Sequence, residues 1–269
     1  MNTKSSLTLR FLESHEVFTL DEFLAAVDPE VSRRTRETNL RNATKRNQAY
    51  RITRGLYASN IGGFRDEVPN VMLVASKAAP DAALAYHSAL EAHGVAHTPA
   101  RTVSFLSAKS IAPFTLRDYR FRRVPAWDDR ASISKERVQV VQVRVGGVLV
   151  PATSRERTLV DCLSRLDLAG GLEELLRSVG SFTTISSEDV VHYAASLNSP
   201  TLSARVCWLL DQMQSEWLFD PTPLTDLRRS VGRGTYWLQS RRPGVEYEFV
   251  APLRLYVPAR QPYRDWLRG

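Results

Sequence analysis

The chain has 269 residues, 43% of them hydrophobic and 24% charged, which is ordinary usage for a globular protein of one or two domains. Its longest stretch without a charged residue is short and partly polar, so we expect no membrane span, and the N-terminus lacks the pattern of a signal peptide. Two cysteines exclude a disulfide scaffold and a four-ligand zinc site, and they predict a cytoplasmic protein with reduced thiols.

Positive charge is concentrated in one short window of the sequence. The chain carries 36 lysine and arginine residues against 29 aspartate and glutamate residues, a formal net charge of +7. Residues 33–54 hold eight bases and one acid, so their net charge of +7 equals that of the whole chain. Such a concentration favours a nucleic-acid partner.

The first sixty residues predict three helices. Apolar residues near the start indicate a first helix, and a capping box formed by Thr19 and Glu22 opens a short second one. The third helix, roughly 32–47, is rich in arginine and asparagine, and Leu40 and Ala43 are almost its only apolar residues. Its single apolar seam can dock on the other two helices and leave a polar face outward.

A basic hairpin follows the third helix. Residues typical of strands flank a three-residue turn, Thr53-Arg54-Gly55. Helix, short helix, basic helix and basic hairpin is the element order of a winged helix-turn-helix. The predicted fold class is therefore α+β, with an N-terminal winged helix-turn-helix at 1–62 and a larger mixed α/β C-terminal domain at 69–269.

The polar face of the third helix fits the major groove of duplex DNA. Arginine and asparagine can bond two base-edge atoms at once, while arginines on the hairpin reach flanking phosphates. A solvated basic helix on an ordinary surface is the alternative. The predicted DNA-binding residues are Arg33, Arg34, Arg36, Thr38, Arg41, Asn42, Lys45, Arg46, Arg51 and Arg54.

After a connector at 64–69, the sequence alternates between strand and helix patterns. Period-two alternation predicts strands at 101–106, 119–122, 138–145, 148–150, 236–238 and 247–257. Helical patterns lie at 81–93, after a second capping box at 153–156, at 172–179, 187–197 and 200–217. Because the larger domain has its own mixed core, we expect residues 69–269 to fold without the winged helix.

No complete catalytic or metal-binding motif is found in the larger domain. His87, His93 and His97 lie close together, but a glycine interrupts their helix and no HExxH motif follows, so we expect them to bond backbone groups. The pair Glu246 and Glu248 is typical of a solvated strand face, with a metal site as the alternative. We predict a protein that is not an enzyme and has no catalytic residue, metal or cofactor.

Two further features have alternative interpretations. The arginine-rich strand from Arg117 to Arg123 is typical of a solvated edge strand, and the alternative is a surface for a nucleic acid or an acidic partner. Cys162 and Cys207 each lie in an apolar helical segment, which predicts buried small hydrophobic side chains.

Four segments resemble the AbiEi-type antitoxins, which are transcriptional regulators of type IV toxin–antitoxin systems. The N-terminal unit ending in Arg54-Gly55-Leu56-Tyr57-Ala58 resembles the winged helix of that family. The segment from Tyr86 to Gly94 is similar to its central helix, and the segments Ser154 to Asp161 and Gly170 to Leu176 resemble its later part. The likeness covers about residues 5–180. The third helix departs from the family pattern because it has few apolar anchors.

The resemblance implies a bacterial system linked to phage resistance. It implies a repressor that binds inverted repeats in the double-stranded DNA of its own operon, and a C-terminal domain that counters a nucleotidyltransferase-like toxin without a stable complex. One winged helix reads only a short half-site, so we expect a dimer on the DNA. The alternatives are a DNA-targeted enzyme, such as a cryptic nuclease or transferase, and an effector-responsive transcriptional regulator.

Overall fold

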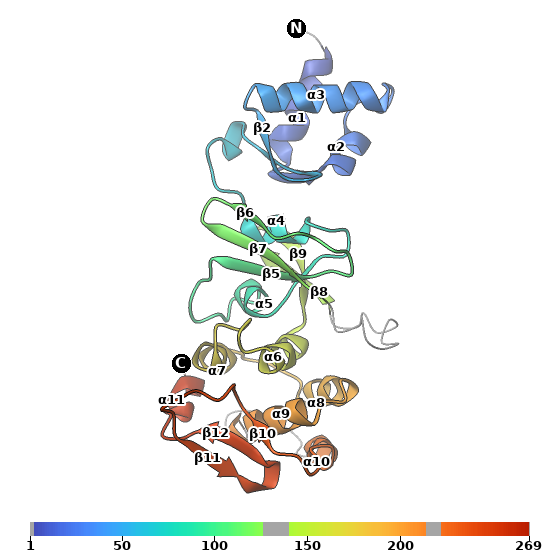
Figure 1. The fold of residues 1–269 in the computed structure, drawn as a ribbon. Helices are drawn as coiled ribbons and strands as arrows, with labels where there is room; N and C mark the ends of the chain where they lie inside the picture. The colour runs from blue at the N-terminus through green and yellow to red at the C-terminus, as the bar shows by residue number, and fades with distance from the viewer. Residues whose placement is uncertain (1–2, 126–139, 214–221, 269) are drawn as a thin grey trace. The chain divides into compact units, whose positions relative to one another are not determined.

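The computed structural model describes residues 3–125, 140–213 and 222–268 and combines helices with several sheets (Figure 1). This confirms the predicted mixture of α and β structure. The chain divides into two units: unit 1 comprises Met1–Leu84, Arg101–Ser134 and Gln142–Pro151, and unit 2 comprises Ala85–Ala100, Lys135–Val141 and Ala152–Gly269. The independent folding of residues 69–269 stays a prediction.

The N-terminal part of unit 1 contains three helices and a small antiparallel sheet. Its elements are α1 (Thr3–Ser14), β1 (Val17–Thr19), α2 (Leu20–Ala26), α3 (Arg33–Lys45), β2 (Ala49–Thr53) and β3 (Leu56–Ser59). The strands lie in the order β1-β3-β2, so β1 extends the predicted hairpin by one strand that the sequence did not indicate. The predicted capping box is confirmed, since Thr19 Oγ1 accepts from Glu22 N at 3.1 Å and Thr19 N donates to Glu22 Oε2 at 2.7 Å.

The core of this part explains how α3 packs with so few apolar residues. Leu40 and Ala43 are 2% and 3% exposed, as predicted. They join a cluster in which Phe11 meets Phe18 and Phe23 edge to face, at ring-centre distances of 5.1 and 5.3 Å. Because α1, β1 and α2 supply the large aromatic side chains, α3 needs only a narrow apolar seam.

A six-stranded sheet follows in the order β6-β7-β5-β4-β9-β8. Its elements, with two short helices before it, are η1 (Gly62–Phe64), α4 (Val71–Ser76), β4 (Ala83–Leu84), β5 (Thr102–Leu106), β6 (Phe114–Leu116), β7 (Tyr119–Val124), β8 (Val140–Val145) and β9 (Val148–Thr153). The arginine-rich strand β7 lies between β6 and β5, antiparallel to the former and parallel to the latter. Its interpretation as an edge strand was therefore wrong, because β6 covers that side.

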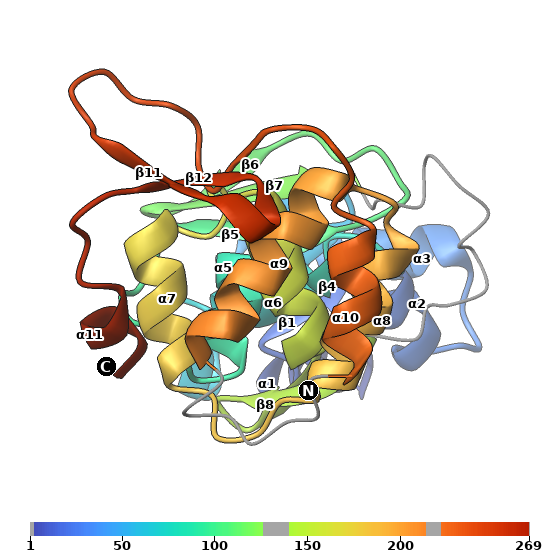
Figure 2. The same cartoon turned by 90° about the horizontal axis from the view of Figure 1, so that it is seen from below.

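Unit 2 is mainly helical and ends in a three-stranded sheet. Its elements are α5 (His87–Ala92), α6 (Arg155–Ser164), α7 (Leu172–Gly180), α8 (Ser187–Ser196), α9 (Pro200–Met213), α10 (Thr222–Arg229), β10 (Tyr236–Trp237), β11 (Tyr247–Val250), η3 (Ala251–Leu253), β12 (Leu255–Pro258) and α11 (Tyr263–Arg268). The strand order is β10-β12-β11. Figure 2 shows β11 and β12 in front of α9. Residues 138–139 and 214–217 of the predicted elements lie outside the described residues.

Two sequence predictions in this region were wrong for local reasons. The helix expected at 81–93 begins only at His87, because residues 83–84 pair as β4 and Tyr86 has a left-handed backbone (φ +56°) that no helix can continue through. The capping box expected at 153–156 does not form. Ser154 caps α6 by accepting from Arg157 N at 3.2 Å, and Glu156 accepts from Ser186 N at 3.2 Å.

Among the described residues, no helix is both long enough and apolar enough to cross a bilayer.

Candidate nucleic-acid interface

One face of α3 presents a row of basic and polar side chains. Ser32 fixes the start of the helix by accepting from Thr35 N at 3.2 Å. Arg34, Thr38, Arg41 and Lys45 then recur at three- and four-residue steps, and all four are exposed. With Leu40 and Ala43 buried on the other side, this row is where the sequence predicted it.

The ten predicted residues differ in how the protein itself uses their side chains. Arg33 pairs with Glu37 at 2.9 Å one turn along, and Arg51 Nε donates to the Thr53 carbonyl at 3.0 Å within the hairpin. The Thr38 hydroxyl donates to the Arg34 carbonyl at 2.8 Å. Within the part of the chain that the structure describes, no residue bonds to the side chains of Arg34, Arg41, Asn42, Lys45, Arg46 and Arg54, all of which are exposed.

Arg36 is the exception among the ten. It is half-buried, and its guanidinium donates to the carbonyl of Leu24 near the end of α2. Its buried Nε has no partner among the described residues. This geometry gives Arg36 a role in holding α2 against α3, and it turns the charged group away from the exposed row.

A hollow of about 360 Å³ lies between α3 and the hairpin. Arg41 and Lys45 line it from the helix, and Arg51 and Tyr57 line it from β2 and β3. Glu37 also lines the hollow, but its carboxylate is paired with Arg33. Two of these cations, Lys45 and Arg51, come from different elements and suit a phosphate backbone, which such side chains contact without reading sequence.

The negative charge of Glu22, at the start of α2, is balanced by its neighbours. Burial by itself raises the pKa of Glu22, but hydrogen bonds from Lys77 and from Thr19, together with the charge of Lys77, outweigh it and lower the pKa. The α2 N-terminus therefore carries an ionised, fully partnered carboxylate. It holds the second helix in place next to the basic row.

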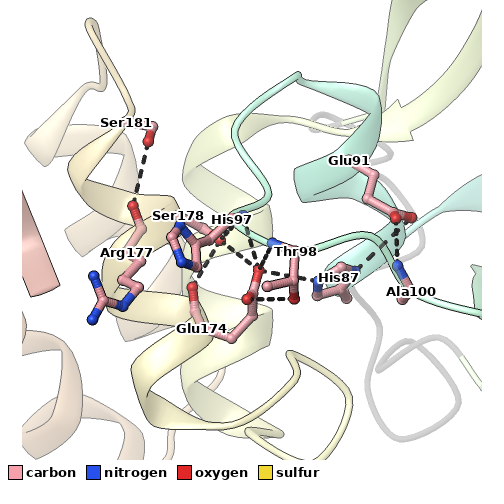
Figure 3. A network of polar contacts seen from close by, with 9 residues as sticks. All are labelled: His87, Glu91, His97, Thr98, Ala100, Glu174, Arg177, Ser178 and Ser181. Atoms are coloured by element: carbon pink, nitrogen blue, oxygen red, sulfur yellow. Dashed lines mark hydrogen bonds and ion pairs between the residues drawn. The ribbon is translucent and has the colours of Figure 1, made fainter. Parts of the chain in front are cut away.

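The three later segments that carry the family resemblance meet in unit 2 around buried polar groups. His87, from the first segment, bonds through Nε2 to Glu174 Oε1, from the third, at 3.2 Å (Figure 3). Glu174 Oε1 also accepts from His97 N at 2.9 Å and Thr98 N at 3.1 Å, and its Oε2 accepts from the Thr98 hydroxyl at 2.8 Å. Glu174 is only 8% exposed, so this is an internal clamp that joins α5 to α7.

Glu91, in α5, is a second carboxyl near His87, and the surroundings shift the pKa values of Glu174 and Glu91 in opposite directions. Burial raises the pKa of Glu174, but the Thr98 hydroxyl and amide and His87 lower it by a larger amount. Burial raises the pKa of Glu91, against the opposing effects of the Ala100 amide and His87. His93 bonds the Thr153 carbonyl at 2.7 Å, as expected for a backbone partner, whereas His87 instead bonds a carboxylate.

The middle segment contributes a second buried polar group. Arg157 Nε bonds Asp161 Oδ2 at 3.3 Å, and Asp161 Oδ1 accepts from the Tyr193 hydroxyl at 2.9 Å. Burial, followed by the charge of Asp161, raises the pKa of Tyr193. Because Arg157 and Asp161 are 6% and 0% exposed, these residues connect α6 to α8 inside the unit and present no reactive surface.

The remaining sequence candidates have structural roles. Cys162 and Cys207 are buried free thiols, and burial raises the pKa of Cys207 to about 12. Glu246 and Glu248 are exposed, and Glu246 pairs with Arg260 at 3.2 Å. In the described part of the chain, no group of three or more His, Cys, Asp and Glu side chains is arranged to hold a metal.

Comparisons with known proteins identify the fold. No protein-family model matches the chain. No curated protein matches its sequence. Among solved structures, the crystal structure of the RV2827C protein from Mycobacterium tuberculosis is similar, with a TM-score of 0.64 over 99% of this chain and 94% of that one, at 16% identity. The chain thus shares its fold with that mycobacterial protein along nearly its whole length.

Proposed function

We propose that residues 1–62 are a winged helix-turn-helix that binds operator DNA, and that the chain is a non-enzymatic, cytoplasmic repressor and antitoxin. The exposed row on α3 carries this proposal. Arg34, Arg41 and Lys45 project from one helix face and make no competing bond to any described residue, so they are available for base edges and phosphates. The hairpin beside them supplies Arg51 and Arg54.

The roles of these residues differ within the proposed complex. Arg34 and Arg41 lie on the helix face that enters the major groove, where an arginine can bond both acceptors of a guanine. Arg51 and Lys45 line the hollow that suits a phosphate, and Arg54 lies at the tip of the hairpin. Arg34 and Arg41 thus discriminate between sequences. The other three residues fix the position of the protein along the duplex.

A mobility-shift assay on the DNA upstream of the gene tests duplex binding. The intact protein should shift this fragment in preference to unrelated DNA, and footprinting should show two protected half-sites in an inverted repeat. Arg54→Ala should weaken binding to all DNA sequences about equally and lower the slope of log affinity against log salt concentration by about 0.9. Equal affinity for every duplex would contradict a specific repressor.

The antitoxin role follows from the resemblance of the segments at Tyr86, Ser154 and Gly170. In support of a common body, two of these segments are joined by the His87–Glu174 bond, and the third contributes the buried Arg157–Asp161 pair of the same unit. The test is growth rescue in cells that express a nucleotidyltransferase-like toxin, encoded beside this gene, from a separate promoter. The full chain carrying Arg34→Ala and Arg41→Ala should still rescue growth while failing to repress. If this variant lost both rescue and repression, the antitoxin effect would depend on the DNA-binding face as well.

A further inference from the structure

The C-terminal sheet carries a row of aromatic side chains on one face. In the register of the three strands, Trp237 of β10 lies opposite Tyr256 of β12, and Tyr256 lies opposite Phe249 of β11. Neighbours in register point to the same side of a sheet. The rings are in contact, since Trp237 stacks on Tyr256 at 4.5 Å between ring centres and Phe249 lies 4.9 Å from Tyr256. Tyr247 extends this row, 4.9 Å from Trp237.

This aromatic row, Trp237, Tyr247, Phe249 and Tyr256, lies on the side of the sheet that faces away from the helices. The alternate residues Leu238, Leu255 and Val257 are 0% exposed and form the inner face. In contrast, Phe249 is 45% exposed and the other three rings are half-buried. Four large rings on one outward face form a platform that the fold of unit 2 does not need for its own core.

The platform lies in the second basic region of the chain. Residues 55–230 hold 19 bases and 19 acids and are neutral, whereas residues 231–269 hold seven arginines and three acids, a net charge of +4. All seven arginines are exposed. The Arg241 guanidinium lies 6.0 Å from the centre of the Trp237 ring, which places a cation over the platform itself. Glu248 points to the opposite face, since it lies in register with the buried Val257.

We propose that this platform binds single-stranded nucleic acid, with bases stacked on the aromatic row and phosphates held by the surrounding arginines. Stacking rings supply affinity for unpaired bases of any sequence, and exposed arginines supply the complementary charge. A face that served an apolar protein partner would not need this charge. A paired duplex hides its base faces, so the platform is distinct in chemistry from the α3 surface and does not depend on the operator-binding proposal.

A pocket beside the platform offers polar contacts to a base edge. It measures about 330 Å³ and is lined by Gln239, Arg242 and Gln261, among others, next to Pro258 at the end of β12. The Tyr247 hydroxyl accepts from Arg242 N at 2.9 Å, which fixes this loop against the aromatic row. The glutamine amides can both donate and accept, as the edge of an unpaired base requires.

The test is fluorescence anisotropy with the intact protein and labelled oligonucleotides of about 12 nucleotides, a length within the range that one such site covers. The probes are oligo(U) RNA, oligo(dT) DNA and a duplex of unrelated sequence. Both single strands should bind, and the ratio of their affinities shows whether the 2′-hydroxyl contributes. Phe249→Ala should weaken both about tenfold, whereas Phe249→Tyr should retain binding because the ring remains. Arg241→Ala should also weaken binding and lower the salt slope by about 0.7.

Glu248→Ala is the matched control, since it changes the neighbouring residue of the same strand on the opposite face. It should leave single-strand affinity unchanged or slightly raised. Thermal melts of each variant check folding, and Trp237→Phe provides a second signal, because bases stacked on Trp237 quench its fluorescence and the variant should lose that quenching.

Three results of these binding measurements would overturn the proposal. They are equal binding by wild type, Phe249→Ala and Arg241→Ala, no binding of either single strand at about 0.1 M salt, and an equal loss in the Glu248→Ala control. Occupation of the face by a protein, with no oligonucleotide bound, would also overturn it. Arg34→Ala with Arg41→Ala should change duplex binding alone, so failure of one proposal can be told from failure of the other.

Discussion

Residues 33–54 and residues 231–268 are both rich in arginine, but they present it on different scaffolds. Most of the first set projects from a helix whose outer face has no aromatic ring, and the second lies in the segment that carries four rings on a sheet, with Arg241 beside one of them. A helix of this width enters a major groove, whereas a flat row of rings needs bases that are already unpaired. The same kind of charge is thus expected to select different forms of nucleic acid, according to what accompanies it.

The largest effect is expected at Glu174, which lies inside the unit that carries the C-terminal sheet. Glu174→Ala leaves the buried His87 and the part-buried bonds of His97 and Thr98 without their acceptor, and we expect a loss of about 3 kcal/mol in the free energy of unfolding of unit 2. Calorimetry measures it. Binding of single strands should be lost as unit 2 unfolds, while duplex binding through α3 should persist at low temperature.

Glu173→Ala is the matched control for this prediction. The Glu173 side chain is 55% exposed and pairs with Arg177 at 3.0 Å on the surface of the same helix, so its removal should cost less than about 1 kcal/mol. A comparable loss at both positions would mean that the clamp around Glu174 contributes no more than a surface ion pair.

The next effect separates the two basic surfaces. The triple variant Arg34→Ala, Arg41→Ala and Lys45→Ala should weaken operator binding about a hundredfold or more, since it removes two base-reading groups and a phosphate contact. A control that removes three exposed arginines of unit 1 elsewhere, Arg101→Ala, Arg117→Ala and Arg120→Ala, should change operator affinity little. Equal losses in a titration would place the operator contact partly on the β7 side.

A smaller difference distinguishes two arginines of the same helix. Arg41→Ala should weaken the operator complex about tenfold and reduce its preference over unrelated DNA, because the side chain faces outward. Arg36→Ala should instead lower the melting temperature, because it loses the bond to the Leu24 carbonyl. If the Arg36 variant lost discrimination at unchanged stability, the inward role of this residue would be wrong.

The smallest expected effect is a change in how the stability of the protein depends on acidic pH. The pKa of Glu174 is lowered in the folded protein, so its contribution to stability is present above the ordinary carboxyl pKa and is lost as the pH falls through the lowered value. Glu91, whose pKa is raised, contributes in the opposite sense. Denaturation experiments at a series of acidic pH values should show that the stability of Glu174→Gln declines less steeply with falling pH than that of wild type. An unchanged decline would assign the acid sensitivity to other carboxyls.

The sequence predicted local features well where one short segment decides the structure. The capping box of Thr19 and Glu22 and the glycine-ended turn after Thr53 act within a few residues, and both formed as expected. The expected capping box at 153–156 failed because Glu156 bonds Ser186, thirty residues away. The strand at 83–84 was missed because its apolar residues fit a helix equally well until Tyr86 reverses the backbone.

The aromatic row was not predicted, for a similar reason. Trp237, Phe249 and Tyr256 come from three short strands, and only the pairing of β10 parallel and β11 antiparallel to β12 brings them into one line. Charge counting found α3 because eight bases fall within 22 residues, whereas the second basic region spreads seven arginines over a longer segment. A separate charge balance for residues 231–269 is the signal that would have indicated it.

The interleaving of the two units has a consequence for synthesis on the ribosome. Residues 85–100 belong to unit 2 but are made before most of it, and His87 and His97 must wait for Glu174 to emerge. The α3 surface, in contrast, is complete once about 60 residues have left the exit tunnel, as expected of folding that proceeds from the N-terminus. A nascent or truncated chain would therefore present its basic helix before the helical unit exists. Ribosomes stalled between residues 151 and 174 should then already carry a folded N-terminus, together with an 85–100 segment whose partner Glu174 has not yet been made.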